Sequence, residues 1–394
     1  MTDRIVLGLG GTLDYLIRWD SAVIEELVLA YGIRSDELST EVPVTSERNL
    51  LRCLLAFVRA GVGGERFVAS SDIVESFARR FVTEVVLGGT GVRAAIAMDK
   101  LGVKTTLHLV SIDDHVRRLL PASCSYVCSA VRDTTDPHLI IQFDAAVRVR
   151  AGDLDLSAPS ANRVILANDP PHEQMRLSPE LGAVLADARI FGISSLNAIR
   201  DPAVLDQRLG ELRDLVAGLP PGCLVHYEDA GFHVPALSRR VNAGLGDRVS
   251  VHSMNEDELH AYLGRTYDLL DASEMAEALR TIRRKLSAPT IVVHTRYWAL
   301  ALGRDVEAFA PALRGGITMA STRYLYGDGF TESDYTTVAR LPPSDAALAF
   351  ATGIEAELPG QVHCQAAILL QTDQPTTVGL GDSFVGGFLA AWPT

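Results

Sequence analysis

A short glycine-containing loop near the C-terminus, Gly379-Leu380-Gly381-Asp382, opens directly into an apolar helix. The glycines let bare backbone approach a ligand, and the first N–H groups of a helix have no partner within it. With the helix dipole, these amides suit a phosphate or the charge that develops in a transition state. Asp382 could accept the proton of an attacking alcohol, although it could also simply cap the helix.

A second group of polar residues follows two predicted strands. His226 and Glu228 are two residues apart on a strand, so they point to the same side, toward the crevice at the carboxyl ends of parallel strands. The pair suits the surroundings of a hydrated Mg²⁺, or else a purely structural His–Glu hydrogen bond. Asn255 and Glu258 begin the next helix. They could lie near phosphates and complete the outer shell of the metal, or could form a capping box.

Acidic residues beside glycine-rich turns form a third group. Asp14 follows a glycine-rich turn at the end of the first strand, and Glu65 follows a similar loop. Each carboxylate could accept hydrogen bonds from adjacent hydroxyl groups of a sugar. The alternative is that each residue only stabilises its own turn. The glycine-rich turn before Asp14 does not have the last glycine of a dinucleotide-binding fingerprint, and no helix is predicted directly after it. A dinucleotide-binding site is therefore excluded there.

Composition limits the classes of function. The chain has 394 residues, of which 47% are hydrophobic and 22% charged, so global disorder is excluded. Its 36 basic and 49 acidic residues give a net charge of −13 without a basic stripe, so a nucleic-acid partner is not expected. No run of about 18 apolar residues predicts a membrane span. Five scattered cysteines and the lack of a signal-peptide pattern predict a soluble cytoplasmic protein with reduced thiols.

Short apolar runs alternate with helical patterns, which predicts a mainly parallel sheet covered by helices in three α/β/α layers. The predicted strands are Ile5–Leu9, Thr105–Val110, Arg189–Ile193, Cys223–Tyr227, Arg248–His252 and Thr290–His294. The predicted helices are Asp201–Ala217, Asp257–Leu263, Glu274–Leu286 and Asp382–Leu389.

Two stretches, 15–86 and 138–170, do not follow this alternation of predicted strands and helices. Within the second, residues 139–143 and 162–166 predict two antiparallel strands separated by a turn. We therefore expect a discontinuous, mostly β lid domain of 15–86 and 138–170. The large domain would contain 1–14, 87–137 and 171–394, with the lid closing over a cleft.

The order of these motifs resembles the ADP-dependent sugar kinases, the glucokinase and phosphofructokinase branch of the ribokinase superfamily. The motifs are Gly88-Gly89, His226-x-Glu228, Asn255-x-x-Glu258 and Gly379-x-Gly381-Asp382, supported by Arg59–Glu65, Asn162-Arg163 and Val293–Tyr297. The similarity extends from residue 5 to about residue 390. It implies a ribokinase-like three-layer α/β/α core and a lid, with the sugar between them.

The resemblance also implies roles for individual residues. Asp382 would be the general base, and the backbone of Gly379, Leu380 and Gly381 would form the anion hole. Glu228 and Glu258 would hold Mg²⁺ through its waters, with His226 supporting Glu228. Asn255, His294 and Thr295 would bind the nucleotide. Asp14, Glu65, Gly89 and Thr90 would contact the sugar.

Two differences from the family pattern lie on the acceptor side. Thr90 stands where the motif normally continues with an amide side chain, and the lid strand ending in Phe143–Val147 lacks the usual lysine. The identity of the acceptor is therefore left open. The sequence does not indicate an oligomeric state. The segment Gly381–Phe388 looks more like the ATP-using ribokinase branch.

The resulting hypothesis is a Mg²⁺-dependent transfer of a phosphoryl group from ADP to a hydroxyl group of a sugar or sugar-like molecule. The alternatives are an ATP-dependent sugar or nucleoside kinase and a non-catalytic sugar- or nucleotide-binding protein. The presence of Asp382, Glu228 and Glu258 argues against the non-catalytic alternative, because a sensor does not need a base.

Overall fold

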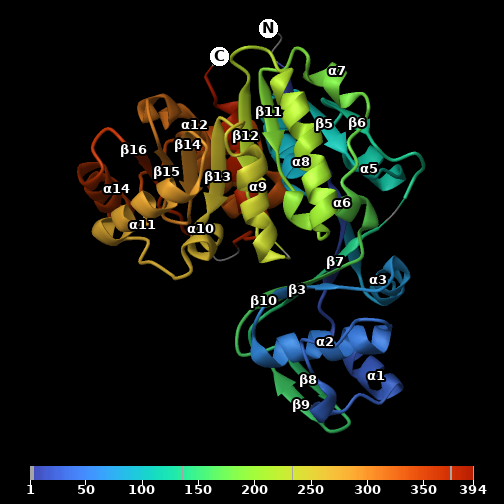
Figure 1. Cartoon of the computed structure of the whole chain (residues 1–394). Coiled ribbons are helices and arrows are strands. Elements are labelled where there is room, and N and C mark those ends of the chain that lie inside the picture. The colour runs from blue at the N-terminus through green and yellow to red at the C-terminus, as the bar shows by residue number, and fades with distance from the viewer. Residues whose placement is uncertain (1–3, 135, 233, 373–374, 394) are drawn as a thin grey trace.

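The computed structural model describes residues 4–134, 136–232, 234–372 and 375–393, and two large sheets organise them (Figure 1). The larger sheet has nine strands and the smaller has five. Among the described residues, no helix is both long and apolar enough to cross a membrane.

The nine-stranded sheet has the order β16-β15-β14-β13-β12-β11-β1-β5-β6. Its strands are β1 (Ile5–Leu7), β5 (Thr105–Leu109), β6 (Cys124–Cys128), β11 (Ile190–Ile193), β12 (Leu224–Glu228), β13 (Val251–Asn255), β14 (Thr290–His294), β15 (Trp298–Leu302) and β16 (Val362–Ala366). All pairs from β6 to β14 are parallel, whereas β15 and β16 form an antiparallel edge that the sequence patterns did not predict. The strand predicted at 248–252 begins three residues later, because the N–H of Arg248 still bonds back to Leu245 in the turn after α9 (Ser238–Leu245).

Helices cover both faces of this sheet. One face packs against α4 (Thr90–Asp99), α12 (Ala310–Tyr326) and α15 (Leu380–Ala390). The other packs against α7 (Leu181–Leu185), α8 (Pro202–Ala217), α9, α11 (Ala272–Lys285) and α14 (Asp345–Glu357). Within β1, Ile5 and Leu7 enter the first core while Val6 enters the second, as the two-residue period of a strand requires. The predicted three-layer α/β/α core is confirmed.

The five-stranded sheet has the order β3-β10-β7-β2-β4. Its strands are β2 (Thr12–Arg18), β3 (Gly64–Phe67), β4 (Thr83–Gly88), β7 (His138–Phe143) and β10 (Asn162–Ala167). It shares an apolar core with α1 (Ser21–Tyr31), α2 (Glu47–Ala60) and α3 (Ser71–Ala78). As predicted, β7 and β10 are antiparallel, with Asn162 opposite Phe143. The segment between them is more than a turn, since it contains the hairpin β8 (Arg148–Ala151) and β9 (Leu154–Ser157).

The predicted domain boundaries at residues 14 and 86 fall inside β2 and β4. These two strands pair from Thr12 opposite Gly88 to Ile17 opposite Thr83, which includes every residue of β4. Both strands therefore belong to the five-stranded sheet throughout, and the division of the chain into two domains stays a prediction.

The remaining helices are short or lie at the ends of strands. They are α5 (Asp114–Leu119), α6 (Pro170–Gln174), α10 (Glu256–Leu263) and α13 (Glu332–Val338). The four predicted helices are all present, with ends that differ from the prediction by no more than two residues.

The contact between α12 and α15 generates a prediction about stability. A Cβ atom on Gly387 would lie 2.3 Å from the carbonyl oxygen of Gly315 and 2.5 Å from Cβ of Met319. We expect Gly387→Ala to destabilise the fold by about 1–3 kcal/mol, because the two helices would have to separate. Urea denaturation measures this change.

Gly210 provides the matched control, because it lies inside α8 with nothing within 4 Å of its Cβ position. Gly210→Ala should be neutral or stabilising by up to about 1 kcal/mol, since alanine is the better helix former. Equal effects of the two substitutions would contradict the packing argument.

Candidate active site

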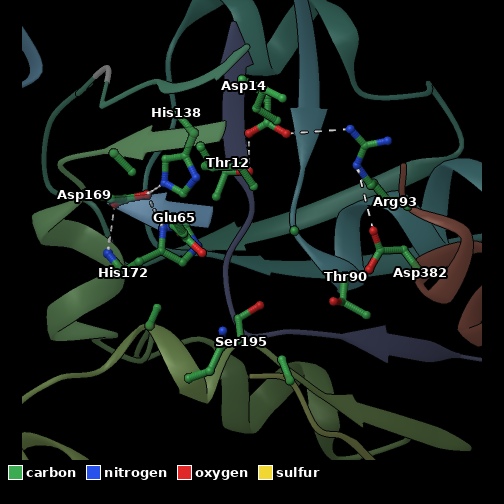
Figure 2. Close-up of a pocket in the computed structure, with 18 of the residues that line it drawn as sticks. Thr12, Asp14, Glu65, Thr90, Arg93, His138, Asp169, His172, Ser195 and Asp382 are labelled. Atoms are coloured by element: carbon green, nitrogen blue, oxygen red, sulfur yellow. Dashed lines mark hydrogen bonds and ion pairs between the residues drawn. The ribbon is translucent and has the colours of Figure 1, made fainter. Parts of the chain in front are cut away.

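A cavity of about 390 Å³ lies where the two sheets approach each other (Figure 2). Asp14 of β2 and Glu65 of β3 reach it from the five-stranded sheet. Asp382 of α15 and Thr90 of α4 reach it from the helices of the large sheet. The other lining residues are Thr12, Phe67, Gly89, Arg93, His138, Ile140, Arg163, Ile165, Ala167, Asp169, His172, Glu173, Ser195, Asn197, Ala198, Ala230, Val378 and Gly379.

The N-terminus of α15 is built as its sequence predicted. Gly379 is the N-cap, with φ 71° and ψ 24°, a left-handed conformation that glycine adopts without a steric penalty. Asp382 follows in the first turn, and its side chain is about one-quarter exposed. The first-turn amides and Asp382 therefore stand at one edge of the cavity, as a phosphate site with an adjacent base requires.

The groups around Asp382 shift its pKa in opposite directions. Burial raises the pKa of Asp382, while the guanidinium group of Arg93 and a hydrogen bond with Thr90 act to lower it. The charge of Glu228 raises it further, so Glu228 and Asp382 are within electrostatic range. The net effect is a pKa above the ordinary value, and hence a stronger base than a surface aspartate.

The predicted acceptor residues also meet in this cavity. Asp14 is 5% exposed, and its Oδ1 accepts a hydrogen bond of 2.7 Å from the hydroxyl of Thr12. A Cβ atom on Gly88 would lie 2.3 Å from Oδ2 of Asp14, so only glycine leaves room for this carboxylate. Gly89, the N-cap of α4, and Thr90, its first residue, line the same wall.

Of the predicted metal residues, His226 and Glu228 lie in β12, and Glu258 lies in the first turn of α10, directly after β13. His294 of β14 contacts Oε1 of Glu228 through Nε2 at 2.8 Å, whereas Nε2 of His226 is 3.9 Å from Oε2 of Glu228. The second distance is too long for a hydrogen bond. The histidine that contacts Glu228 is therefore His294 and not His226, because Glu228 and His294 are the last residues of their strands, whereas His226 lies two residues earlier in β12.

Burial determines the protonation of two of these groups. It lowers the pKa of His226 to about 4, so this imidazole is neutral at neutral pH. Burial raises the pKa of Glu258 to about 7, while the N–H of Asn255 acts in the opposite direction. A cation nearby would favour the ionised form of Glu258.

Asn255 and Glu258 form the capping box that the sequence allowed. The side chain of Asn255 accepts hydrogen bonds from the N–H groups of Asp257 and Glu258, and Glu258 accepts one from the N–H of Asn255. Thr295 has a similar local role, because its hydroxyl accepts hydrogen bonds from the N–H groups of Tyr297 and Trp298. None of these three side chains lines the 390 Å³ cavity. Contact of Asn255, His294 and Thr295 with a nucleotide, and the role of Glu258 at a metal, stay predictions.

The sequence patterns missed a histidine pair in the cavity. Asp169 is 6% exposed, and its Oδ2 lies 3.0 Å from Nε2 of His138 and 2.8 Å from Nδ1 of His172 (Figure 2). Burial acts to lower the pKa of His138, but the hydrogen bond with Asp169 and the surrounding carboxylates raise it to about 9. The Asp-Pro-Pro-His sequence at 169–172 is typical of a helix N-terminus and gave no sign of His138, which lies 31 residues away.

Arg93 is the other residue that sequence analysis missed. It extends from α4 between Asp14 and Asp382 (Figure 2). In the sequence it is the only charged residue of α4 before Asp99. The feature of the sequence that could have indicated Arg93 is a charged residue among apolar and small residues in this helix.

The core is a three-layer α/β/α sheet, and a second sheet lies across the cavity from it. The model of the ADP-specific phosphofructokinase/glucokinase conserved region matches residues 3–390, so the chain belongs to this family. No sequence among the curated proteins matches the chain.

Solved structures show the same fold over nearly the whole chain. A phosphofructokinase from Pyrococcus horikoshii OT3 with AMP has a TM-score of 0.82 at 18% identity, covering 98% of this chain and 97% of that one. The last common ancestor of ADP-dependent phosphofructokinases from Methanosarcinales has a TM-score of 0.77 at 15% identity, covering 98% and 93%. An ADP-dependent kinase in complex with fructose-6-phosphate and ADPβS has a TM-score of 0.72 at 14% identity, covering 99% and 94%. At these identities the likeness shows the fold alone.

The pKa of His138 predicts a pH-dependent stability. A value of about 9 in the folded protein, above the ordinary 6.5, means that the folded state binds this proton more tightly than the unfolded state. The contribution is fully present below pH 6.5 and is lost as the pH rises through about 9.

We therefore expect the free energy of unfolding of the wild type to exceed that of His138→Gln by more at about pH 6 than at about pH 9.5. Urea denaturation at the two pH values measures the difference. A difference that does not change with pH would contradict the ion pair with Asp169.

Proposed function

We propose that this protein is a Mg²⁺-dependent phosphotransferase that moves the terminal phosphoryl group of ADP to a hydroxyl group of a sugar or sugar-like acceptor. The observation that carries the proposal is a single cavity lined by Asp382 at the start of α15 and by Asp14 and Glu65 of the other sheet. Family membership supports the donor and the class of acceptor.

The transfer makes and breaks one bond to phosphorus. The acceptor oxygen attacks the β-phosphorus of ADP, and its proton passes to the carboxylate of Asp382. The bond from the β-phosphorus to the bridging oxygen breaks, and its electron pair leaves with AMP. The raised pKa of Asp382 suits it to accept the proton, and the first-turn amides of α15 would stabilise the charge on the transferred group.

The five-stranded sheet would hold the acceptor. Asp14 and Glu65 present carboxylate oxygens to the cavity, where they can accept hydrogen bonds from adjacent hydroxyl groups. Thr90 lies beside Asp382 and would help to orient the reacting hydroxyl. Closure of this sheet over the cavity would exclude water, which would otherwise compete for the phosphoryl group.

The residues near Glu228 fit a hydrated Mg²⁺. The Oε2 atom of Glu228 is buried and has no hydrogen-bond partner in the described part of the chain, so a cation or its water would satisfy it. Glu228 and Glu258 would hold the ion through water molecules, which Mg²⁺ usually retains. Within that same part of the chain, no group of three or more His, Cys, Asp or Glu side chains could ligate a metal directly. When bound, the ion would offset the charge of the diphosphate.

The first test is the identity of the donor and the acceptor. With Mg²⁺ present, we expect AMP to form when ADP is incubated with a suitable acceptor from a panel of hexoses, sugar phosphates and nucleosides. Chromatography of the nucleotides measures the products. Faster turnover with ATP, or nucleotide binding without turnover on any acceptor, would contradict the proposal.

The role of Asp382 predicts a loss of turnover on Asp382→Asn. The amide cannot accept the proton, so kcat should fall by about 100-fold or more while the affinity for ADP stays nearly unchanged. Steady-state kinetics and calorimetric titration with ADP separate the two effects.

Asp345→Asn is the matched control, since Asp345 lies exposed in the first turn of α14. It should leave kcat unchanged. An active Asp382→Asn variant would remove Asp382 from the role of base.

The role of Glu228 predicts an effect on Mg²⁺. Glu228→Gln keeps a partner for His294 but removes the negative charge, so the Mg²⁺ concentration for half-maximal activity should rise by about tenfold or more. Titration of activity with Mg²⁺ at saturating ADP measures it. An unchanged Mg²⁺ dependence would place the ion elsewhere.

A further inference from the structure

Arg93 occupies the space between the two carboxylates that the proposed function uses. Its side chain is 10% exposed. Its Nη2 lies 3.6 Å from Oδ2 of Asp14, and its Nε lies 3.9 Å from Oδ2 of Asp382 (Figure 2). Both distances exceed the 2.7–3.2 Å of an ordinary N–H···O hydrogen bond. A largely buried guanidinium group thus lies between two acids without a hydrogen bond of ordinary length to either of them.

The third nitrogen of Arg93 points to the start of α15. Its Nη1 lies 3.1 Å from the position that a Cβ atom on Gly379 would occupy. This is the point where the first-turn N–H groups of the 11-residue helix begin. The three nitrogens of Arg93 therefore face the acceptor carboxylate, the proposed base and the proposed anion hole.

A second guanidinium group, that of Arg323, also lies close to Gly379. Nη1 of Arg323 lies 3.0 Å from the same Cβ position, and the Arg323 side chain is only 5% exposed. Asp328 holds its Nε at 2.7 Å, but Nη1 is buried and has no hydrogen-bond partner in the described part of the chain. Two positive groups thus converge on one glycine. This arrangement favours an anion there.

We propose that Arg93 is a further catalytic residue, whose guanidinium group binds the oxygens of the phosphoryl group during its transfer. This inference rests on the proposed function. In phosphoryl transfer the charge is spread over three equatorial oxygens, and the planar fork of a guanidinium group matches two of them. Arg93 gains and loses no bond: the acceptor proton goes to Asp382 and the leaving electron pair to AMP.

The cavity needs such a cation. Asp14 and Asp382 both line it, and their negative charges would repel an incoming diphosphate. Arg93 lies between them and lines the same cavity, so its charge offsets both. Arg323 does not line this cavity, so its effect would be to fix the position of Gly379 rather than to contact the phosphoryl group.

The test compares Arg93→Gln and Arg93→Lys with the wild type. Arg93→Gln should lower kcat by about 100-fold or more, with smaller changes in KM for ADP and for the acceptor, because the contact forms mainly in the transition state. Arg93→Lys keeps the charge without the fork and should give an intermediate kcat. Arg79→Gln, at a position where the arginine side chain is 73% exposed, is the matched control and should leave kcat unchanged.

A second measurement does not depend on turnover. Inorganic phosphate should bind the wild type, as measured by calorimetry, and Arg93→Gln should weaken this binding at least tenfold. If the wild type transfers no phosphoryl group to any acceptor, the proposed function fails, but loss of phosphate binding in Arg93→Gln would still support the contact.

Two results would overturn the inference. One is an Arg93→Gln variant with near-normal kcat and normal phosphate affinity. The other is an effect limited to KM for acceptors that already carry a phosphate, which would assign Arg93 to the acceptor instead. Urea denaturation of each variant shows whether a loss of activity comes from unfolding.

Discussion

The position of α15 is the constraint on which the site depends. The helix is packed between α4 and α12 through two adjacent glycines. A Cβ atom on Gly386 would lie 2.8 Å from the carbonyl oxygen of Ala94 in α4, and Gly387 meets Gly315 of α12. Backbone-to-backbone contact on both sides leaves the helix little freedom to slide or rotate. Its N-terminus, with Gly379 and Asp382, is thereby held at the edge of the cavity.

Charge within the cavity is a second constraint on the site. The protein as a whole carries a net charge of −13, and Asp14, Asp382 and Asp169 add negative charge in the cavity where we propose that an anionic donor binds. Local cations compensate for this field: Arg93 lies between the first two, and His138, whose pKa is raised to about 9, contacts Asp169. Because such groups are partly buried, their interactions are screened less than those of surface charges. Local placement therefore outweighs net charge in deciding what the cavity can bind.

Much of the fold and part of the site could be predicted from the sequence. The loop at Gly379 and the antiparallel strands at 139–143 and 162–166 were predictable, because each depends on neighbouring residues or on a strong apolar pattern. The support of Glu228 by His294 was not, since the two residues are 66 positions apart and His226 was the nearer candidate. The antiparallel edge strands β15 and β16 and the hairpin β8–β9 were also missed, because short strands resemble ordinary turns and apolar runs.

The amino-acid sequence by itself determined the three-layer α/β/α class, the family motifs, and the carboxylate that follows a glycine at the start of the last helix. These features are local, since they arise from periodicity, from glycine conformations and from helix termini. Only the tertiary structure decided that Asp14, Glu65 and Asp382 share one cavity and that Arg93 lies between two of them. The physical reason is that long-range contacts depend on how α4, α15 and the two sheets pack, and no spacing along the chain encodes that packing directly.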